Sequence, residues 1–206
     1  MSQTNAKKSL GALIPVAVLV ILGIILFVYV KNVNNNLVKQ EEQVKTAWSQ
    51  VENQYQRRLD LIPNLVRTVQ AYANHERATL QAVIEARAKA TQVSVNADNL
   101  NPAALQAFQS AQDGLGGALS RLLVSVERYP DLKASEQFTT LQVQLEGTEN
   151  RIAVERMRFN ESARDYNTAA RTFPANIVAS LFGFEQYPYF KASEGAERAP
   201  QVDFSN

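Results

Sequence analysis

Residues 10–30 contain no charged or strongly polar side chain, and this run constrains the fold more than any other feature of the chain. Lys7 and Lys8 precede the run, and Lys31 closes it. About twenty residues at ~1.5 Å per residue give a helix of roughly 30 Å, the thickness of the hydrocarbon core of a bilayer. We therefore predict a transmembrane helix over residues 10–30, preceded by a short tail at residues 1–9.

The apolar run admits two other interpretations, a cleaved signal peptide and a buried helix of a soluble protein. It is longer than the apolar core of a typical signal peptide, and residues 28–31 lack the small side chains that a signal peptidase recognises. We therefore expect an uncleaved anchor and a single-pass membrane protein. Lysines stand on both sides of the run, so their numbers do not fix its orientation. The chain has no cysteine, which agrees with an extracytoplasmic domain without requiring one.

The rest of the chain carries the pattern of a helical bundle. The Asn-rich segment at residues 31–36 favours a hinge or a helix start. Large apolar side chains then recur at spacings of three and four, which is typical of helices packed nearly parallel to one another. This seam contains Val44, Trp48, Val51, Tyr55, Ile62, Leu65, Val69 and Tyr72, then Leu105, Phe108, Leu115, Leu119, Leu122, Val126 and Tyr129, then Phe138, Leu141, Leu145, Ile152, Phe159, Tyr166 and Phe173. We predict an all-α fold, with an up-and-down bundle of three long helices over residues 37–190 whose shorter fourth C-terminal element lies at residues 175–184.

Proline and asparagine mark the predicted helix ends. Asn101 followed by Pro102 is typical of an N-cap and a first helical residue. Pro130 and Pro174 each end the helix before them, because proline clashes with a helical residue that precedes it. Pro63 lies inside the first apolar pattern, where we expect it to kink or divide the helix.

Catalytic motifs are absent from the sequence or incomplete. His75 and Glu76 resemble the start of the H-E-x-x-H zinc-protease motif, but Thr79 takes the place of the second histidine. A Ser-His-Asp triad would depend on His75, the one histidine of the chain, and a solvated histidine is the simpler interpretation. We predict no catalytic residue, metal, cofactor or small-molecule substrate. Acidic and basic residues are interspersed at a net charge of +1, so we expect no nucleic-acid partner.

A glycine cluster in the second helical segment resembles a nucleotide-binding loop only superficially. Gly114, Gly116 and Gly117 follow a helical pattern, and Leu119 occupies the place of the third glycine. We instead expect the small side chains at positions 114, 117 and 118 to let another helix approach closely.

Charged and polar residues cluster in the first and third predicted helices. The candidate interaction residues are Glu52, Arg57, Arg58, Asp60, Glu146, Glu149, Asn150, Arg151, Glu155 and Arg156. Ion pairing is favoured over a di-metal site, which would need more than one histidine. The spacing puts Arg58 and Glu155 on the seams of their helices, so we expect Arg58 to pair with Glu155 or a neighbouring acid. The alternative is that these charges flank the seams in solvent.

The most apolar stretch outside the anchor lies at residues 173–184. The candidate docking residues in it are Ile177, Leu181, Phe182 and Phe184. They would contact a partner helix or the membrane interface. The alternative is that they cover the open end of the bundle. We expect residues 191–206 to form a flexible tail.

Two long blocks resemble the signature of the LemA family, AWSQVENQYQRRLDLIPNLV at residues 47–66 and LEGTENRIAVER at residues 145–156. Shorter matches lie at residues 121–123, 129–133 and 182–184, so that the resemblance covers residues 35–204. The resemblance implies a bacterial, membrane-attached helical bundle without established catalytic residues. Relatives that carry a lipid-anchoring cysteine imply an extracytoplasmic bundle, although this chain has an apolar helix in its place. The resemblance also implies an association with membrane remodelling and with membrane metalloproteases.

We therefore predict a non-catalytic, membrane-anchored scaffold of the bacterial envelope. Its expected partners are the lipid bilayer and either a second copy of the chain or another membrane protein, including a metalloprotease. Two other functions stay open, an envelope enzyme or transport accessory and a membrane-remodelling protein. An enzyme or transport accessory would have one concave pocket that contains a carboxylate with a raised pKa. The residues expected in that pocket are Glu52, Arg58, Glu149 and Glu155. The second would require Ile177, Leu181 and Phe182 to face lipid.

Overall fold

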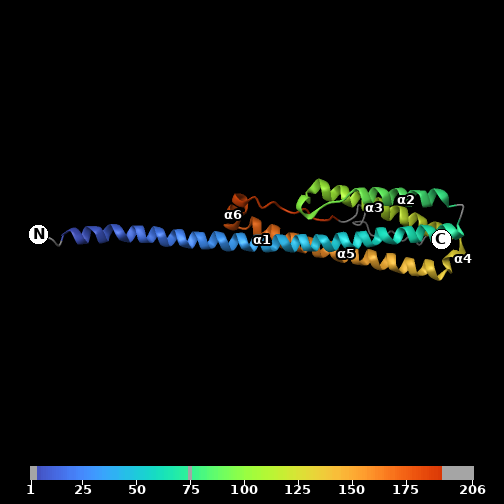
Figure 1. Cartoon of the computed structure of the whole chain (residues 1–206), viewed down its shortest axis with the longest axis horizontal. Helices are drawn as coiled ribbons and strands as arrows, with labels where there is room; N and C mark the ends of the chain where they lie inside the picture. The colour runs from blue at the N-terminus through green and yellow to red at the C-terminus, as the bar shows by residue number, and fades with distance from the viewer. Residues whose placement is uncertain (1–3, 74–75, 192–206) are drawn as a thin grey trace, which may run out of the picture. The chain divides into compact units, whose positions relative to one another are not determined.

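The computed structural model describes residues 4–73 and 76–191, with side chains from residue 15 onward. Its helices are α1 (Thr4–Tyr72), α2 (Arg77–Gln92), η1 (Ala97–Asn99), α3 (Pro102–Val126), α4 (Pro130–Lys133), α5 (Glu136–Arg171) and α6 (Ala175–Phe182) (Figure 1). No strand occurs in this described part, so the predicted all-α fold is confirmed. The chain divides into two units, one of Met1–Val44 with Arg164–Gln186, the other of Lys45–Ala163 with Tyr187–Asn206.

Helix α1 contains both the apolar run and the first bundle segment. It continues through the Asn-rich segment at residues 31–36, so the helix start predicted there is wrong. Val33 and Leu37 pack in an apolar cluster of the first unit, and this packing stabilises helical turns that asparagine alone would disfavour. Pro63 does not divide α1 either. It is exposed, while Ile62 and Leu65 beside it are buried in the bundle core.

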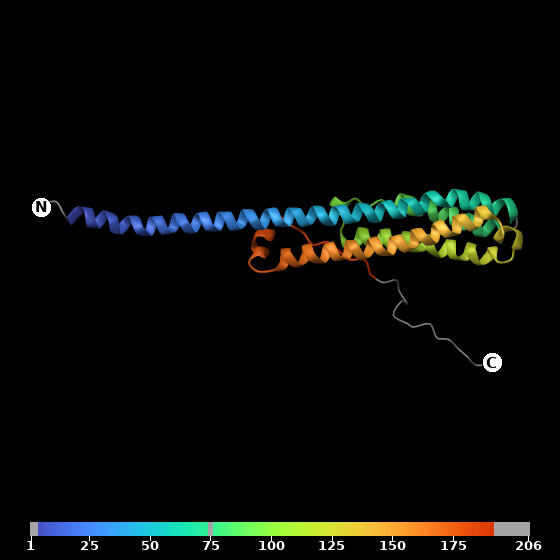
Figure 2. The same ribbon diagram turned by 90° about the horizontal axis from the view of Figure 1, so that it is seen from below.

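The second unit is an up-and-down bundle of α2, α3 and the parts of α1 and α5 that belong to this unit (Figures 1 and 2). The predicted seam forms its core, from Trp48 on α1 to Phe159 on α5. Two seam residues are exceptions and are exposed, Tyr72 at the end of α1 and Phe173 after α5. Asn101 caps α3 as predicted, because its side-chain oxygen accepts a hydrogen bond of 2.9 Å from the Ala104 backbone N–H.

Helix α2 is a bundle helix that the sequence analysis did not predict. It packs beside α3 but buries only Leu80, Val83 and Ala90 of its own side chains. A small apolar face rich in alanine produces no clear rhythm of large side chains. The turn between α1 and α2 also contains neither proline nor glycine, so no helix stop was visible in the sequence.

Aromatic rings fill the core of the second unit around Trp48, which is fully buried. The centroid of its ring lies 5.4 Å from that of Phe108, 5.5 Å from that of Phe159 and 5.9 Å from that of Phe190. The indole N–H donates a hydrogen bond of 3.0 Å to the backbone oxygen of Val95, in the segment between α2 and α3. Trp48 therefore joins four separate parts of the bundle.

The C-terminal segment at residues 187–190 completes this core. Phe190 is buried, and its backbone N–H and carbonyl oxygen both bind the side-chain amide of Asn160, at 2.9 Å and 3.1 Å. The guanidinium carbon of Arg156 lies 4.7 Å from the centre of the Phe190 ring. An extended segment is thus held against α5 by both hydrogen bonds and ring contacts.

The glycines of α3 do not create the close helix approach that the sequence suggested. A Cβ atom added at Gly114 would meet nothing within 4 Å, and one at Gly117 would meet only the end of the Arg121 side chain at 3.8 Å. Ala118 is buried, as a packing residue should be. The expectation of close approach is therefore wrong at Gly114, which lies on the exposed side of the helix.

We expect Gly114→Ala to raise the free energy of unfolding by about 1 kcal/mol, because glycine in a helix interior is less favourable than alanine by that amount. Urea unfolding of the full chain in detergent micelles, followed by circular dichroism, measures the change. Gly183→Ala is the matched control, since Gly183 ends α6 at a φ of 75° that alanine tolerates poorly. A loss of stability in Gly114→Ala would show that the open space over α3 is covered by another chain.

Candidate functional site

A buried arginine lies at the centre of the candidate site. Arg58 on α1 is only 4% exposed. Its guanidinium pairs with the carboxylate of Glu149 on α5 and donates through Nη2 to Gln112 on α3, at 2.6 Å to the side-chain oxygen and 3.2 Å to the backbone oxygen. The Tyr55 ring, one turn earlier on α1, lies 5.0 Å from the guanidinium carbon. Arg58 therefore links three helices of the bundle.

Arg58 pairs with an acid of α5 as expected, but this acid is not Glu155, and a second partner, Gln112, was not predicted. Glu155 does not bind Arg58 but accepts a hydrogen bond of 2.8 Å from Arg158 of its own helix. The neighbouring acid, Glu149, takes its place. Gln112 was not predicted, although it lies at the skipped seam position between Phe108 and Leu115. A polar residue at a seam position is the signal that identifies such a buried partner.

Arg58 lines a cleft of about 1140 Å³ in the second unit. Its lining includes Tyr55, Gln109, Asp113, Glu149 and Arg156. Burial raises the pKa of Tyr55, and the positive charges of Arg156 and Arg58 partly oppose this rise. Of the four residues that an enzymatic site was expected to gather, Arg58 and Glu149 line the cleft, whereas Glu52 and Glu155 are not among its lining residues. Burial also raises the pKa of Glu52, but away from this cleft.

The other candidate interaction residues lie on the surface of the bundle. The exposed ones are Arg57, Asp60, Glu146, Asn150 and Arg151. Asp60 accepts a hydrogen bond of 2.8 Å from Gln56, and Glu146 accepts one of 3.0 Å from Gln142, each within one helix. Arg156 is half-buried and donates to the backbone oxygen of Lys191 at 2.8 Å. In residues 4–73 and 76–191, no three His, Cys, Asp or Glu side chains are close enough to hold a metal ion.

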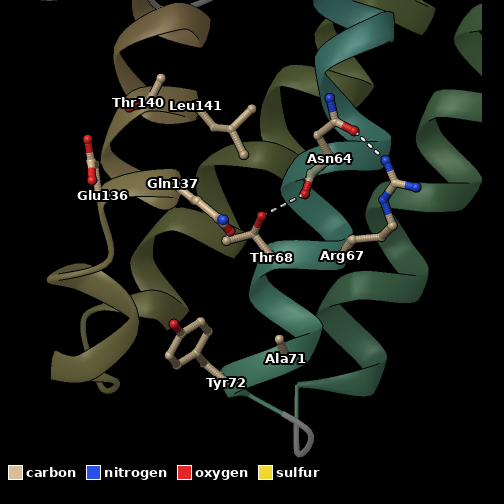
Figure 3. Close-up of a pocket in the computed structure, with 9 residues that line it drawn as sticks. All are labelled: Asn64, Arg67, Thr68, Ala71, Tyr72, Glu136, Gln137, Thr140 and Leu141. Carbon is tan, nitrogen blue, oxygen red and sulfur yellow. Dashed lines mark hydrogen bonds between the residues drawn. The ribbon is translucent and has the colours of Figure 1, made fainter.

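A second groove, of about 560 Å³, lies between the end of α1 and the start of α5 (Figure 3). Thr68 donates to the backbone oxygen of Asn64 at 2.9 Å, and Arg67 donates to the Asn64 side chain. Both of these hydrogen bonds stay within α1, and Glu136 and Gln137 line the opposite wall. The Thr68 hydroxyl donates to a backbone oxygen and not to a base, so we assign the groove no chemistry.

Glu76, which belongs to the incomplete zinc motif of the sequence, has a structural role as a hydrogen-bond acceptor. His75 lies outside the described residues, and Glu76 is buried at the start of α2. Its carboxylate accepts hydrogen bonds of 2.7 Å from Arg128 and 3.1 Å from the Tyr129 hydroxyl. Partial burial, followed by this bond to Glu76, raises the pKa of Tyr129. The carboxylate thus links the start of α2 to the residues that follow α3.

The candidate docking residues of the first unit have different environments. Ile177, Leu181 and Phe182 on α6 are exposed. Phe184, after the helix, is half-buried against a cluster formed by Leu37, Ala170 and Ala179. Helix α6 thus covers part of α1 with one side and leaves large apolar side chains uncovered on the other. The predicted flexible tail lies outside the described residues, apart from Lys191.

The family model of the LemA family matches residues 47–204. The chain belongs to the LemA family. Arg58, Gln112 and Glu149 all lie inside the matched region, and the apolar run lies outside it. The helix that contains this run is long and apolar enough to cross a membrane, which suggests membrane anchoring.

The chain is also similar to individual proteins, one of which carries the LemA name. Protein LemA of Metamycoplasma hominis is 29% identical over 173 residues, which cover 84% of this chain and 75% of that protein. Magnetosome protein MamQ of Magnetospirillum gryphiswaldense is 36% identical over 85 residues, which cover 41% of this chain and 31% of that protein. Magnetosome protein MamQ 2 of Paramagnetospirillum magneticum is 25% identical over 213 residues, which cover 93% of this chain and 77% of that protein.

Proposed function

We propose that this LemA family protein is a membrane-anchored, non-catalytic helical scaffold of the bacterial envelope that self-associates through the outer face of α5. Residues 10–30 would anchor it as a single span, with the bundle on the extracytoplasmic side. The observation that carries the proposal is a second apolar stripe on α5, separate from the stripe that forms the core.

The outer stripe contains Val143, Gly147, Asn150, Val154 and Met157, at alternating spacings of four and three residues. Val143 is 62% exposed, Val154 40% and Met157 54%. The outward positions of a bundle helix usually carry charged side chains, whereas this stripe repeats the spacing of a helix–helix seam. A Cβ atom added at Gly147 would meet nothing within 4 Å, so a second helix has room to approach.

We favour a second copy of the chain as the partner, because the stripe has the features of a self-complementary seam. An asparagine at its centre is a residue that fixes register in paired helices. Glu146 and Arg151 flank the stripe with opposite charges, which suits pairing of the same surface with itself.

The non-catalytic part of the proposal is supported by the cleft around Arg58. The arginine's charge is paired with Glu149, and the side-chain oxygen of Gln112 is also bound to the guanidinium. Such a network fits a structural link between helices better than a reactive group. A membrane-remodelling protein is the second candidate, because α6 exposes large apolar side chains in the unit that contains the anchor.

Disulfide cross-linking in native membranes tests self-association, since the natural chain contains no cysteine. We expect Val154→Cys to give a disulfide-linked dimer under mild oxidation, because the stripe would bring two copies of this position together. Arg57→Cys, at an exposed position of α1, is the matched control and is expected to remain monomeric. Equal cross-linking of the two variants would contradict the proposal, and linkage to a different protein would replace a second copy with another partner.

A further inference from the structure

Helix α6 has one buried side and one exposed apolar side. Val178 and Ala179 are buried, whereas Ile177 is 59% exposed and Leu181, one turn later, is 76% exposed. Phe182 at the end of the helix is exposed as well. A contiguous exposed patch of large apolar side chains on a soluble surface marks an interaction site.

The patch carries no charge. Between Arg171 and Glu185 the sequence contains no acidic or basic residue. A protein-binding surface commonly has a polar or charged rim, whereas an uncharged aliphatic and aromatic helix face suits the boundary between lipid headgroups and acyl chains.

The place along α1 at which α6 packs indicates what the exposed face of α6 contacts. Ala179 shares an apolar cluster with Leu37, against which Val33 also packs. These two residues follow Val30, the last residue of the apolar run, by three and seven positions, or roughly 5 and 10 Å along the helix. The headgroup layer of a bilayer is about 5–8 Å thick on each side. Val33 therefore lies in the headgroup layer and Leu37 at its outer edge, so a helix packed beside them meets the bilayer surface from the aqueous side.

Within the first unit, no other described helix lies beside α1 between α6 and the apolar run. In both views α6 lies beside α1 where α5 ends, and α1 alone continues toward the N-terminus (Figures 1 and 2). All of these segments belong to the same unit. Eight residues are too few for a stable isolated helix, but α6 is already formed by its packing on α1.

We infer that α6 is an interfacial helix that inserts Ile177 and Leu181 into the surface of the bilayer that α1 crosses. The occupant of the exposed face is lipid, at the boundary between headgroups and acyl chains. This inference rests on the membrane-spanning role of residues 10–30 in the proposed function. It adds a second membrane contact, distant in sequence from the first, which would fix the angle and rotation of α1 in the bilayer.

Site-directed fluorescence on the full chain tests this contact. Single-cysteine variants Leu181→Cys, Leu22→Cys and Arg57→Cys are labelled with bimane and reconstituted into vesicles of phosphatidylcholine and phosphatidylglycerol. One set of vesicles contains lipid with a nitroxide near the top of the acyl chain, and iodide is the quencher in water. We expect the label at Leu181 to be quenched by the nitroxide lipid and protected from iodide. The label at Arg57, which is exposed on α1, should show the reverse.

The label at Leu22 separates failure of the inference from failure of the anchor. If Leu22 is protected from iodide while Leu181 is quenched by iodide and not by the lipid, the anchor stands and the interfacial helix is refuted. Protection of Leu181 from both quenchers would also refute it, because protein would then cover α6. If iodide quenches the label at Leu22, both the anchor and the inference are wrong.

Discussion

Trp48→Ala is expected to lower the free energy of unfolding of the bundle by about 4 kcal/mol, since removal of a large buried aromatic side chain costs about 3–5 kcal/mol. Three aromatic rings would lose their central contact, and the cavity would lie between α1, α3 and α5. The backbone oxygen of Val95 would also lose the indole N–H that it binds. Because folded domains are stable by only about 5–15 kcal/mol, this one change would remove much of the total.

Urea unfolding of the full chain in detergent micelles measures this effect. Trp48 is the single tryptophan of the chain, so circular dichroism must replace intrinsic fluorescence as the signal. Trp48→Phe is the matched control, because it keeps an aromatic ring but loses the hydrogen bond to Val95. We expect it to cost about 1–2 kcal/mol. A loss below about 1 kcal/mol in Trp48→Ala would mean that the aromatic cluster is not the core of the bundle.

Glu149→Ala is expected to destabilise the bundle by about 2 kcal/mol, because it leaves the buried guanidinium of Arg58 without its counter-charge. Glu149 itself is half-exposed, so the cost comes from Arg58 and not from burial of the carboxylate. In an Arg58→Met background the same change should cost about 0.5 kcal/mol or less, since no buried charge is left unpaired.

The four chains of this double-mutant cycle are compared by urea unfolding. Glu146→Ala, an exposed position on the same helix, is the control and should change stability by less than about 0.5 kcal/mol. Equal costs of Glu149→Ala in both backgrounds would show that the ion pair contributes no coupling energy. The result would then assign the buried arginine to another partner within the cleft.

The sequence predicted the helices of this fold better than the contacts between them. Large apolar residues at spacings of three and four identified the core of α1, α3 and α5, because burial in a bundle requires that spacing. The N-cap at Asn101 followed from local chemistry alone. Helix α2 was not predicted, because it buries few side chains and no helix-breaking residue precedes it.

The sequence did not predict which residues of two neighbouring helices lie opposite each other. Arg58 was placed correctly on a seam, but its acid is Glu149 and not Glu155, nearly two turns away on the same helix. The alignment of α1 with α5 depends on turns and on the added helix α2, neither of which the apolar spacing specifies.

The hydrogen bonds between Phe190 and Asn160 have a consequence for how the protein folds during its synthesis. Phe190 lies against Trp48, yet it follows all of the described helices in the chain. Vectorial synthesis therefore delivers this ring only after these helices have been made. Until then the nascent chain holds an incomplete aromatic cluster, and completion of this core depends on the segment at residues 187–190.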